Sequence, residues 1–351
     1  MIIYTTTCLI SVLLAWLVEH IRYGNKTPNT YIKAIIAAIP AIIVTGFRYG
    51  IGTDYFGYQG IFYSEGSFKD PLFSLFNQGI KILGGDFYTS IFVISIIFFT
   101  LVYIRIFEDS KYPWLSVFLL FGMIYFFAFM NAIRQFLAIS ILIYSIKFLE
   151  EKRNFLFFLF LLTAIGIHRA SILFLAVFVI TKIKCNFKYL LVATPLICIL
   201  IYLGKNYIVT PLLGLLDYFN YTGTSVIGFR TVGGFLYQIV LTLLAYSGYR
   251  DFTSKNEEMK YRIYFGMQML SLWMYSLWGG INENEINRIL AYFQFSSIIF
   301  APIVLQKLKA ASIRKVIALS MILYFSANIY ITIAVNNEQE TLPYETVFSQ
   351  M

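Results

Sequence analysis

Residues 30–58 read TYIKAIIAAIPAIIVTG followed by FRYGIGTDYFGY, an almost wholly apolar run that ends in a glycine-rich polar loop. The loop places Arg48, Asp54, Tyr55 and Tyr58 directly beyond the run. Glycine lets a backbone approach a ligand closely, Arg offers a planar fork of donors that suits phosphate, and Tyr rings suit sugars. The stretch predicts a membrane-embedded fold with a site for a charged, sugar-bearing ligand at the membrane face. The alternative is an ordinary glycine-rich connector with an Arg near the headgroups.

The composition excludes a water-soluble domain. Hydrophobic residues make up 59% of the 351 residues and charged residues only 13%, with a mean hydropathy of +0.73. A soluble surface of this size needs far more charge. We therefore expect an all-α, polytopic integral membrane protein that forms a single transmembrane domain over residues 1–351, with its site in the outer-face loops.

Apolar runs that suit the hydrocarbon core recur along the whole chain. We expect about twelve transmembrane helices, and about ten to twelve remain possible because two runs are short. Segment 71–83 is too short and too polar to span, and we expect it to lie in the interface or to re-enter between helices. The expected spans are 2–19, 31–46, 88–106, 113–129, 132–149, 154–167, 169–181, 188–204, 232–249, 261–279, 287–305 and 313–335.

The basic residues predict which face of the membrane each loop occupies. Most of the 27 Lys and Arg residues, Arg105 among them, fall in the short loops of one face. The positive-inside rule assigns that face to the cytoplasm. We interpret these residues as solvated loop residues that report topology. Both termini and the long loops 47–87 and 205–231 are then expected outside.

Three short motifs place polar side chains at helix mouths on the expected outer face. The residues are Arg134 and Gln135 in NAIRQFLA, His168 and Arg169 in IHRAS, and Glu283, Arg288 and Tyr292 in NENEINRILAY. A positive charge at such a position opposes the orientation rule, so we expect each Arg to have a compensating partner. The alternatives are snorkelling anchors, a structural His and a Glu that caps its helix.

The sequence has no Walker loop, HExxH zinc site, Cys/His cluster or DxD metal motif. Its three cysteines have neither pairing nor metal spacing, and its basic residues stand in short loops and do not indicate nucleic acid. We expect no metal and no cofactor. A donor that arrives from the membrane, carries phosphate and bears sugars would be a polyprenyl-pyrophosphate-linked oligosaccharide.

Several motifs together resemble the EpsG branch of the Wzy-type polysaccharide polymerases over nearly the whole chain. They are RYGIGTDYFGY after the second apolar run, NAIRQFLA, IHRAS, the R-x-x-x-Y of Arg288 and Tyr292, and a closing LPY. The resemblance implies a polymerase of O-antigen, capsule or exopolysaccharide repeat units in the cytoplasmic membrane of a bacterium. Such an enzyme transfers a growing glycan from undecaprenyl pyrophosphate to a lipid-linked repeat unit on the outer side. Its partners would be these lipid-linked units, the bilayer, a flippase and a chain-length regulator.

The residues themselves suggest metal-independent glycosyl transfer, in which fixed guanidinium groups stabilise the leaving pyrophosphate. Asp54 or His168 would act as the general base, and we favour Asp54 because it belongs to the more distinctive motif. The expected pyrophosphate ligands are Arg48, Arg134, Arg169 and Arg288, with Tyr55, Tyr58, Gln135, Glu283 and Tyr292 as further substrate contacts.

Two other functions share parts of this pattern. A flippase or other transporter of lipid-linked oligosaccharide predicts charged residues through the membrane midplane and a repeat between the two halves, whereas here the ionisable residues collect at one face. An O-antigen ligase uses the same lipid donor and the same chemistry and differs only in its acceptor. A purely structural scaffold leaves the outer arginines unexplained.

Overall fold

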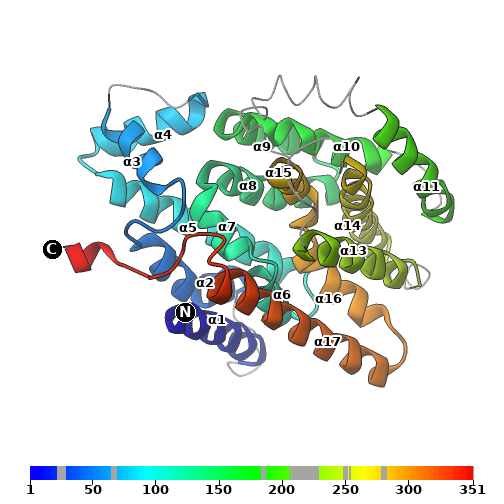
Figure 1. The fold of residues 1–351 in the computed structure, drawn as a ribbon. Coiled ribbons are helices and arrows are strands. Elements are labelled where there is room, and N and C mark those ends of the chain that lie inside the picture. Colours follow the sequence, from blue (N-terminus) through cyan, green and yellow to red (C-terminus); the bar gives the residue numbers. More distant parts are fainter. Residues whose placement is uncertain are drawn as a thin grey trace.

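The computed structural model is an assembly of packed helices (Figure 1). It describes residues 1–21, 29–64, 69–182, 187–204, 207, 229–247, 252, 254–277 and 283–350. Within these ranges there is no β-strand, and one isolated antiparallel bridge joins Arg48 to Thr346. The expected all-α fold class is therefore confirmed for these ranges.

The helices follow one another through short connections. The first half contains α1 (Ile2–His20), α2 (Thr30–Gly46), α3 (Tyr55–Tyr63), α4 (Pro71–Ile82), α5 (Phe87–Asp109), α6 (Pro113–Gly122), α7 (Tyr125–Asn131), α8 (Ile133–Glu150) and α9 (Asn154–Ile167). The second half contains η1 (Arg169–Phe174), α10 (Leu175–Lys182), α11 (Phe187–Gly204), α13 (Phe229–Ser247), α14 (Lys255–Met274), η3 (Tyr275–Leu277), α15 (Glu283–Gln294), α16 (Ser297–Lys307), α17 (Ala311–Ile329), η4 (Tyr330–Val335) and η5 (Val347–Gln350).

Each expected span coincides with one helix or with two consecutive helices, but the expected number of membrane crossings is not confirmed. Among the described helices, three are long and apolar enough to cross a membrane alone, namely Ile2–His20, Phe87–Asp109 and Ala311–Val335. Two bent pairs, α6 with α7 and α15 with α16, raise this number to five if each pair is one span. Four shorter apolar helices fall below the roughly 20 residues that a crossing needs, namely Thr30–Gly46, Asn154–Ile167, Lys188–Gly204 and Val232–Ser247. The predicted loop 205–231 lies almost wholly outside the described residues.

Several breaks in these helices lie at positions where a helix cannot continue. The bend of 52° between α6 and α7 occurs at Ile124, whose φ of 66° is left-handed. A second break at Ala132 separates α7 from α8. Irregular backbone is tolerated at membrane depth where protein covers it, and Ile124 is fully buried. The break at Ala132 places Asn131 at the end of one helix and Arg134 in the first turn of the next.

The C-terminal tail packs against the loop that follows α2. Gly52 and Tyr49 donate backbone hydrogen bonds to the carbonyl groups of Glu340 and Glu345, at 3.1 and 3.0 Å. The hydroxyl of Tyr4, in α1, donates to the carbonyl of Thr341 at 2.7 Å. The tail therefore lies against loop 47–54, and the start of α1 lies against the tail (Figure 1). We name this end of the bundle the loop end; that it faces away from the cytoplasm stays a prediction.

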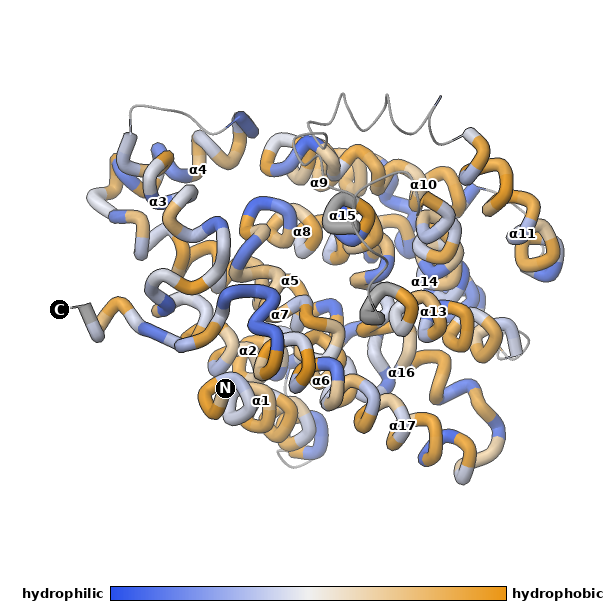
Figure 2. The backbone as a smooth tube through the Cα atoms, viewed as in Figure 1, coloured by the Kyte–Doolittle hydropathy of each residue, from blue (hydrophilic) through white to orange (hydrophobic). Residues whose placement is uncertain are grey.

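The outward surfaces of the helices are apolar. Leu9 and Leu13 on α1, Leu196 on α11 and Leu319 and Leu323 on α17 are all more than half exposed. Figure 2 shows hydrophobic residues along these helices and a hydrophilic stretch in the tail after α17. This is the surface that a bilayer covers, and it is typical of a multi-pass membrane protein.

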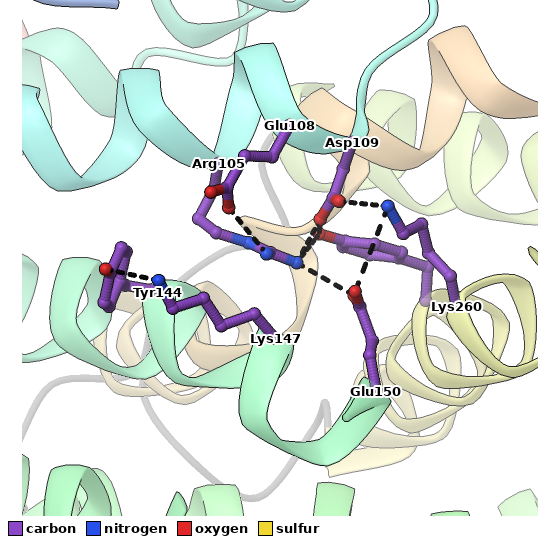
Figure 3. Close-up of polar contacts among 8 residues, drawn as sticks. Arg105, Glu108, Asp109, Tyr144, Lys147, Glu150 and Lys260 are labelled. Atoms are coloured by element: carbon purple, nitrogen blue, oxygen red, sulfur yellow. Dashed lines mark hydrogen bonds and ion pairs between the residues drawn. The ribbon is translucent and has the colours of Figure 1, made fainter. Parts of the chain in front are cut away.

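The far end of the bundle holds a buried network of ion pairs, shown in Figure 3. Arg105, from α5, is 1% exposed and pairs with the carboxylates of Glu108, Asp109 and Glu150. Lys260, from α14, pairs with Asp109 and, at 3.9 Å, with Glu150. The interpretation of Arg105 as a solvated loop residue is wrong, because helix α5 continues through it to Asp109 and carries its side chain inward.

Candidate functional site

Arg134 is at the centre of a polar cluster at the loop end. It lies in the first turn of α8, where the positive end of the helix dipole disfavours a cation unless an anion is near. Its Nη1 is 2.5 Å from Oδ2 of Asp70, and its Nε donates to the Tyr58 hydroxyl at 3.4 Å. The guanidinium also lies over the Tyr58 ring, 5.6 Å from the centroid. The expected partner of this Arg is therefore present.

Asp70 links this Arg to the IHRAS segment. Its Oδ1 accepts a hydrogen bond from the backbone N–H of Arg169 at 3.3 Å and lies 3.9 Å from Nε of the same residue. The Arg169 guanidinium in turn donates to the carbonyl of Lys69 at 3.1 Å. Asp70 is only 4% exposed. The three residues therefore fix α4, α8 and η1 to one another.

Sequence reasoning missed Asp70, although a local signal was available. Asp70 precedes Pro71 at the start of a helix, and Pro favours the first helical position. An Asp in the preceding position normally caps its own helix. Here the side chain makes no such cap in α4, so its carboxylate is directed at the two arginines instead. The Asp-Pro pair at the start of α4 is the local sequence feature that indicates this carboxylate.

His168 lies between α9 and η1, where the backbone is extended. Its Nδ1 is 2.7 Å from the hydroxyl of Tyr292, which is fully buried in α15. Burial, together with the guanidinium groups of Arg134 and Arg288, lowers the pKa of His168 to about 3. The ring is therefore neutral at physiological pH.

The third predicted motif joins the same cluster through Gln135. Its amide donates to the backbone carbonyl of Arg288 at 2.6 Å, and its side chain is 2% exposed. This contact connects α8 to α15. The structure therefore brings together most of the expected set, namely Tyr58, Arg134, Gln135, His168, Arg169, Arg288 and Tyr292. The side chain of Glu283 lies outside the described residues.

Arg48 lies in a different environment. It is fully buried, it donates to the carbonyl groups of Thr45 and Met130, and it lies 5.8 Å from the ring centroid of Phe129. The hydroxyl of Tyr55 bonds to the Arg48 carbonyl at 3.4 Å. These contacts hold the loop, and the structure does not bring Arg48 or Tyr55 into the cluster around Arg134. A phosphate would reach Arg48 only after the loop and the tail had moved.

Asp54 is also apart from the arginine cluster. It is partly exposed before α3, and among the described contacts its carboxylate accepts one hydrogen bond, from Thr53 Oγ1 at 3.4 Å. None of the described contacts joins Arg48 to this carboxylate, because the Arg48 side chain is buried and donates to the carbonyl groups of Thr45 and Met130.

Asn131, which sequence reasoning also missed, connects the loop to the tail. Its Oδ1 accepts from the Thr53 backbone N–H at 2.6 Å, and its Nδ2 donates to the Gln339 carbonyl at 3.1 Å. Gly52 lies directly against it with a φ of +101°, and a Cβ there would be 2.5 Å from the Asn131 oxygen. This position therefore requires glycine.

Among the described residues, no group of three or more His, Cys, Asp and Glu side chains is arranged to hold a metal ion. The fold and the cluster define a class, a helical membrane protein with arginines and a neutral histidine gathered at one end. Residues 31–346 match the model of the EpsG family. The chain belongs to this family, whose members are Wzy-type polysaccharide polymerase-like proteins. No curated protein and no solved structure matches the chain.

Proposed function

We propose that this protein polymerises polysaccharide repeat units at the outer side of the bacterial cytoplasmic membrane. The growing glycan leaves undecaprenyl pyrophosphate and is transferred to a lipid-linked repeat unit. The observation that supports this most directly is the convergence of Arg134 and Arg169 on Asp70 beside His168, whose pKa is lowered by burial and by Arg134 and Arg288. Transfer from a pyrophosphate donor needs a general base for the acceptor hydroxyl and positive groups that stabilise the leaving pyrophosphate.

The arginines would bind the pyrophosphate and stabilise its charge as it departs. Arg134 and Arg169 each retain exposed surface, 28% and 49% of their side chains. Arg134 uses Nε and Nη1 for Tyr58 and Asp70, and its Nη2 has no partner among the described residues. Each donor edge of its planar fork therefore already uses one N–H group, and the N–H groups of Nη2 are available to a phosphate oxygen.

His168 would take the proton from the acceptor hydroxyl. For its Nε2 to accept that proton, the Nδ1–H must be donated to the Tyr292 oxygen, 2.7 Å away. The acceptor oxygen then forms a bond to the anomeric carbon of the growing chain while the bond from that carbon to the pyrophosphate breaks. The pair of electrons leaves with the pyrophosphate, where the guanidiniums stabilise it. The nearness of His168 to Arg134 and Arg288, and the position of Asp54 apart from the cluster, support His168 as the base.

The described polar residues favour a polymerase over a transporter of the same lipid. The expectation that the ionisable residues collect at one face is wrong, because ionisable clusters lie at both ends of α8. The buried polar group between α13, α14 and α16, however, contains only neutral side chains, Gln238, Gln268 and Ser297. A transporter that carries a pyrophosphate across needs charged ligands near the midplane. A flippase and a chain-length regulator would then be separate partners.

The proposal is tested with purified protein in liposomes that contain undecaprenyl-pyrophosphate-linked repeat units. The unchanged protein should give a ladder of polymer. Arg134→Lys should lose most of it, because Lys keeps the charge but not the bidentate fork. His168→Gln should stop elongation while donor binding remains. Arg153→Lys is the control, since the Arg153–Glu151 pair is exposed at the far end.

The absence of a ladder from the unchanged protein would overturn the proposed function, and normal ladders from both outer variants would overturn the roles given to Arg134 and His168. If Asp54→Asn stops elongation and His168→Gln does not, then Asp54 is the base. Polymer formed only when a different glycolipid is supplied as acceptor would identify a ligase instead.

A further inference from the structure

We propose that Asp70 is a positioning residue of this site, which holds Arg134 in its binding orientation and limits the affinity of the site for anions. The inference rests on the proposed function, because it concerns the same arginines. It assigns a role to a residue that lies outside the predicted motifs.

The geometry shows how one carboxylate orders two arginine-bearing segments. Oδ2 contacts the side chain of Arg134 at 2.5 Å, while Oδ1 accepts the backbone N–H of Arg169 at 3.3 Å. Each oxygen contacts a different helix, so a displacement of Asp70 would break contacts to α8 and to η1 together. Tyr58 fixes the same guanidinium from the other side through Nε. Arg134 therefore has little rotational freedom while Asp70 is in place.

Charge gives Asp70 a second effect. Asp70 is buried, so its negative charge is poorly screened by water. A pyrophosphate bound to Arg134 would share that guanidinium with a carboxylate of the same sign. The ground-state complex is therefore weaker than it would be without Asp70. The orientation that Asp70 imposes favours turnover, because a misplacement of about 1 Å costs roughly 10²-fold in rate.

These two effects give a signature that a merely structural residue would not produce. In Asp70→Asn the amide keeps the size of the side chain but removes the charge. Binding of the anionic donor should become tighter, by roughly tenfold, while the turnover number falls by roughly 10²-fold. A structural role alone would weaken both binding and turnover, or would lower the amount of folded protein.

The experiment measures three quantities on detergent-purified protein: the reaction of Arg134 with an arginine-selective dicarbonyl, the Kd for undecaprenyl pyrophosphate, and the turnover number. In Asp70→Asn we expect faster Arg134 modification, a lower Kd and slower turnover. Glu345→Gln is the matched control, since it removes an exposed negative charge at the same end. It should leave all three unchanged.

The outcomes separate the two proposals. If the unchanged protein does not bind undecaprenyl pyrophosphate, the proposed function fails, while the rate of Arg134 modification still tests whether Asp70 holds the side chain. Unchanged Arg134 modification, or a raised Kd in folded Asp70→Asn, overturns the role of Asp70. If Asp70→Asn does not fold, Asp70→Glu decides. Its longer side chain should leave the Kd unchanged and slow turnover, and normal turnover there would refute the inference.

Discussion

Replacing Arg105 by Met should destabilise the protein far more than the same change at an exposed Arg. The side chain of Asp109 is 0% exposed and that of Glu150 is 15% exposed. In Arg105→Met, Lys260 is the one cation left to them in the described network. Breaking a buried ion pair by removing one partner costs about 3–5 kcal/mol. We therefore expect the equilibrium constant for unfolding to rise by more than about 10²-fold.

The control is Arg153→Met at the same end of the bundle. Arg153 pairs with Glu151 at 3.2 Å, but the two side chains are 58% and 51% exposed. An exposed pair of this kind contributes roughly 0–1 kcal/mol. Unfolding by SDS in mixed micelles, followed by the fluorescence of the four Trp residues, gives both free energies on one scale.

A double variant separates loss of an ion pair from loss of packing. Arg105→Met with Asp109→Leu removes both charges and leaves Lys260 to pair with Glu150. Since apolar replacement of a buried pair is often neutral, the double variant should recover much of the stability that Arg105→Met loses. Equal destabilisation by Arg105→Met and Arg153→Met, or no recovery in the double variant, would refute the reasoning.

Three further predictions concern the loop end. His168 has a pKa of about 3 in the folded protein and 6.5 ordinarily, so the polymerisation rate should not fall as the pH drops through 6.5. Below pH 6.5 the His168 side chain binds a proton in the unfolded chain but not in the folded site, so the free energy of unfolding should decrease as the pH falls. His168→Gln should reduce this dependence of the free energy of unfolding on pH, as measured by denaturation at a series of pH values. Tyr292→Phe should slow turnover by roughly tenfold at unchanged protein levels, because the hydroxyl that orients the imidazole is lost. Gly52→Ala should lower the melting temperature, since its φ is +101° and its Cβ would meet Asn131, whereas Gly57→Ala, with nothing within 4 Å, should not.

Much of the fold was predictable because hydrophobic runs mark helices directly, yet the ends of the helices were not. The start of α14 was expected near residue 261, but the helix begins at Lys255 with the Ser254 side chain accepting from the Glu257 N–H. Its first turns are charged, so hydropathy does not report them. The break at Ile124 could not be predicted either, because no sequence pattern indicates an Ile with a left-handed backbone conformation. The packing around Ile124 holds this conformation.

The residues of the candidate site were predictable where a charged side chain stands at a position that normally disfavours it. Arginines at helix mouths stood out because the orientation rule disfavours them, and Arg134 and Arg169 do converge on one carboxylate. Arg48 carried the same signal, yet it is enclosed, because the C-terminal tail folds over its loop through contacts nearly 300 residues apart in the chain. Contacts of that range leave no local pattern. Asp70 does have a local sequence pattern, but that pattern does not stand out, because an acidic residue before the first turn of a helix is common.

Helix α8 connects the two charged ends of the molecule. Arg134 lies in its first turn and Glu150 in its last, and its 18 residues span roughly 27 Å. A slip by one residue would move Arg134 by about 1.5 Å and rotate it by about 100°, enough to remove it from Asp70. The network of Arg105, Lys260 and Glu150 fixes the far end of α8 to α5 and α14, so such a slip would break buried ion pairs at both ends. In this structure the register of one helix, set partly by charges far from the site, determines where the proposed phosphate-binding Arg is held.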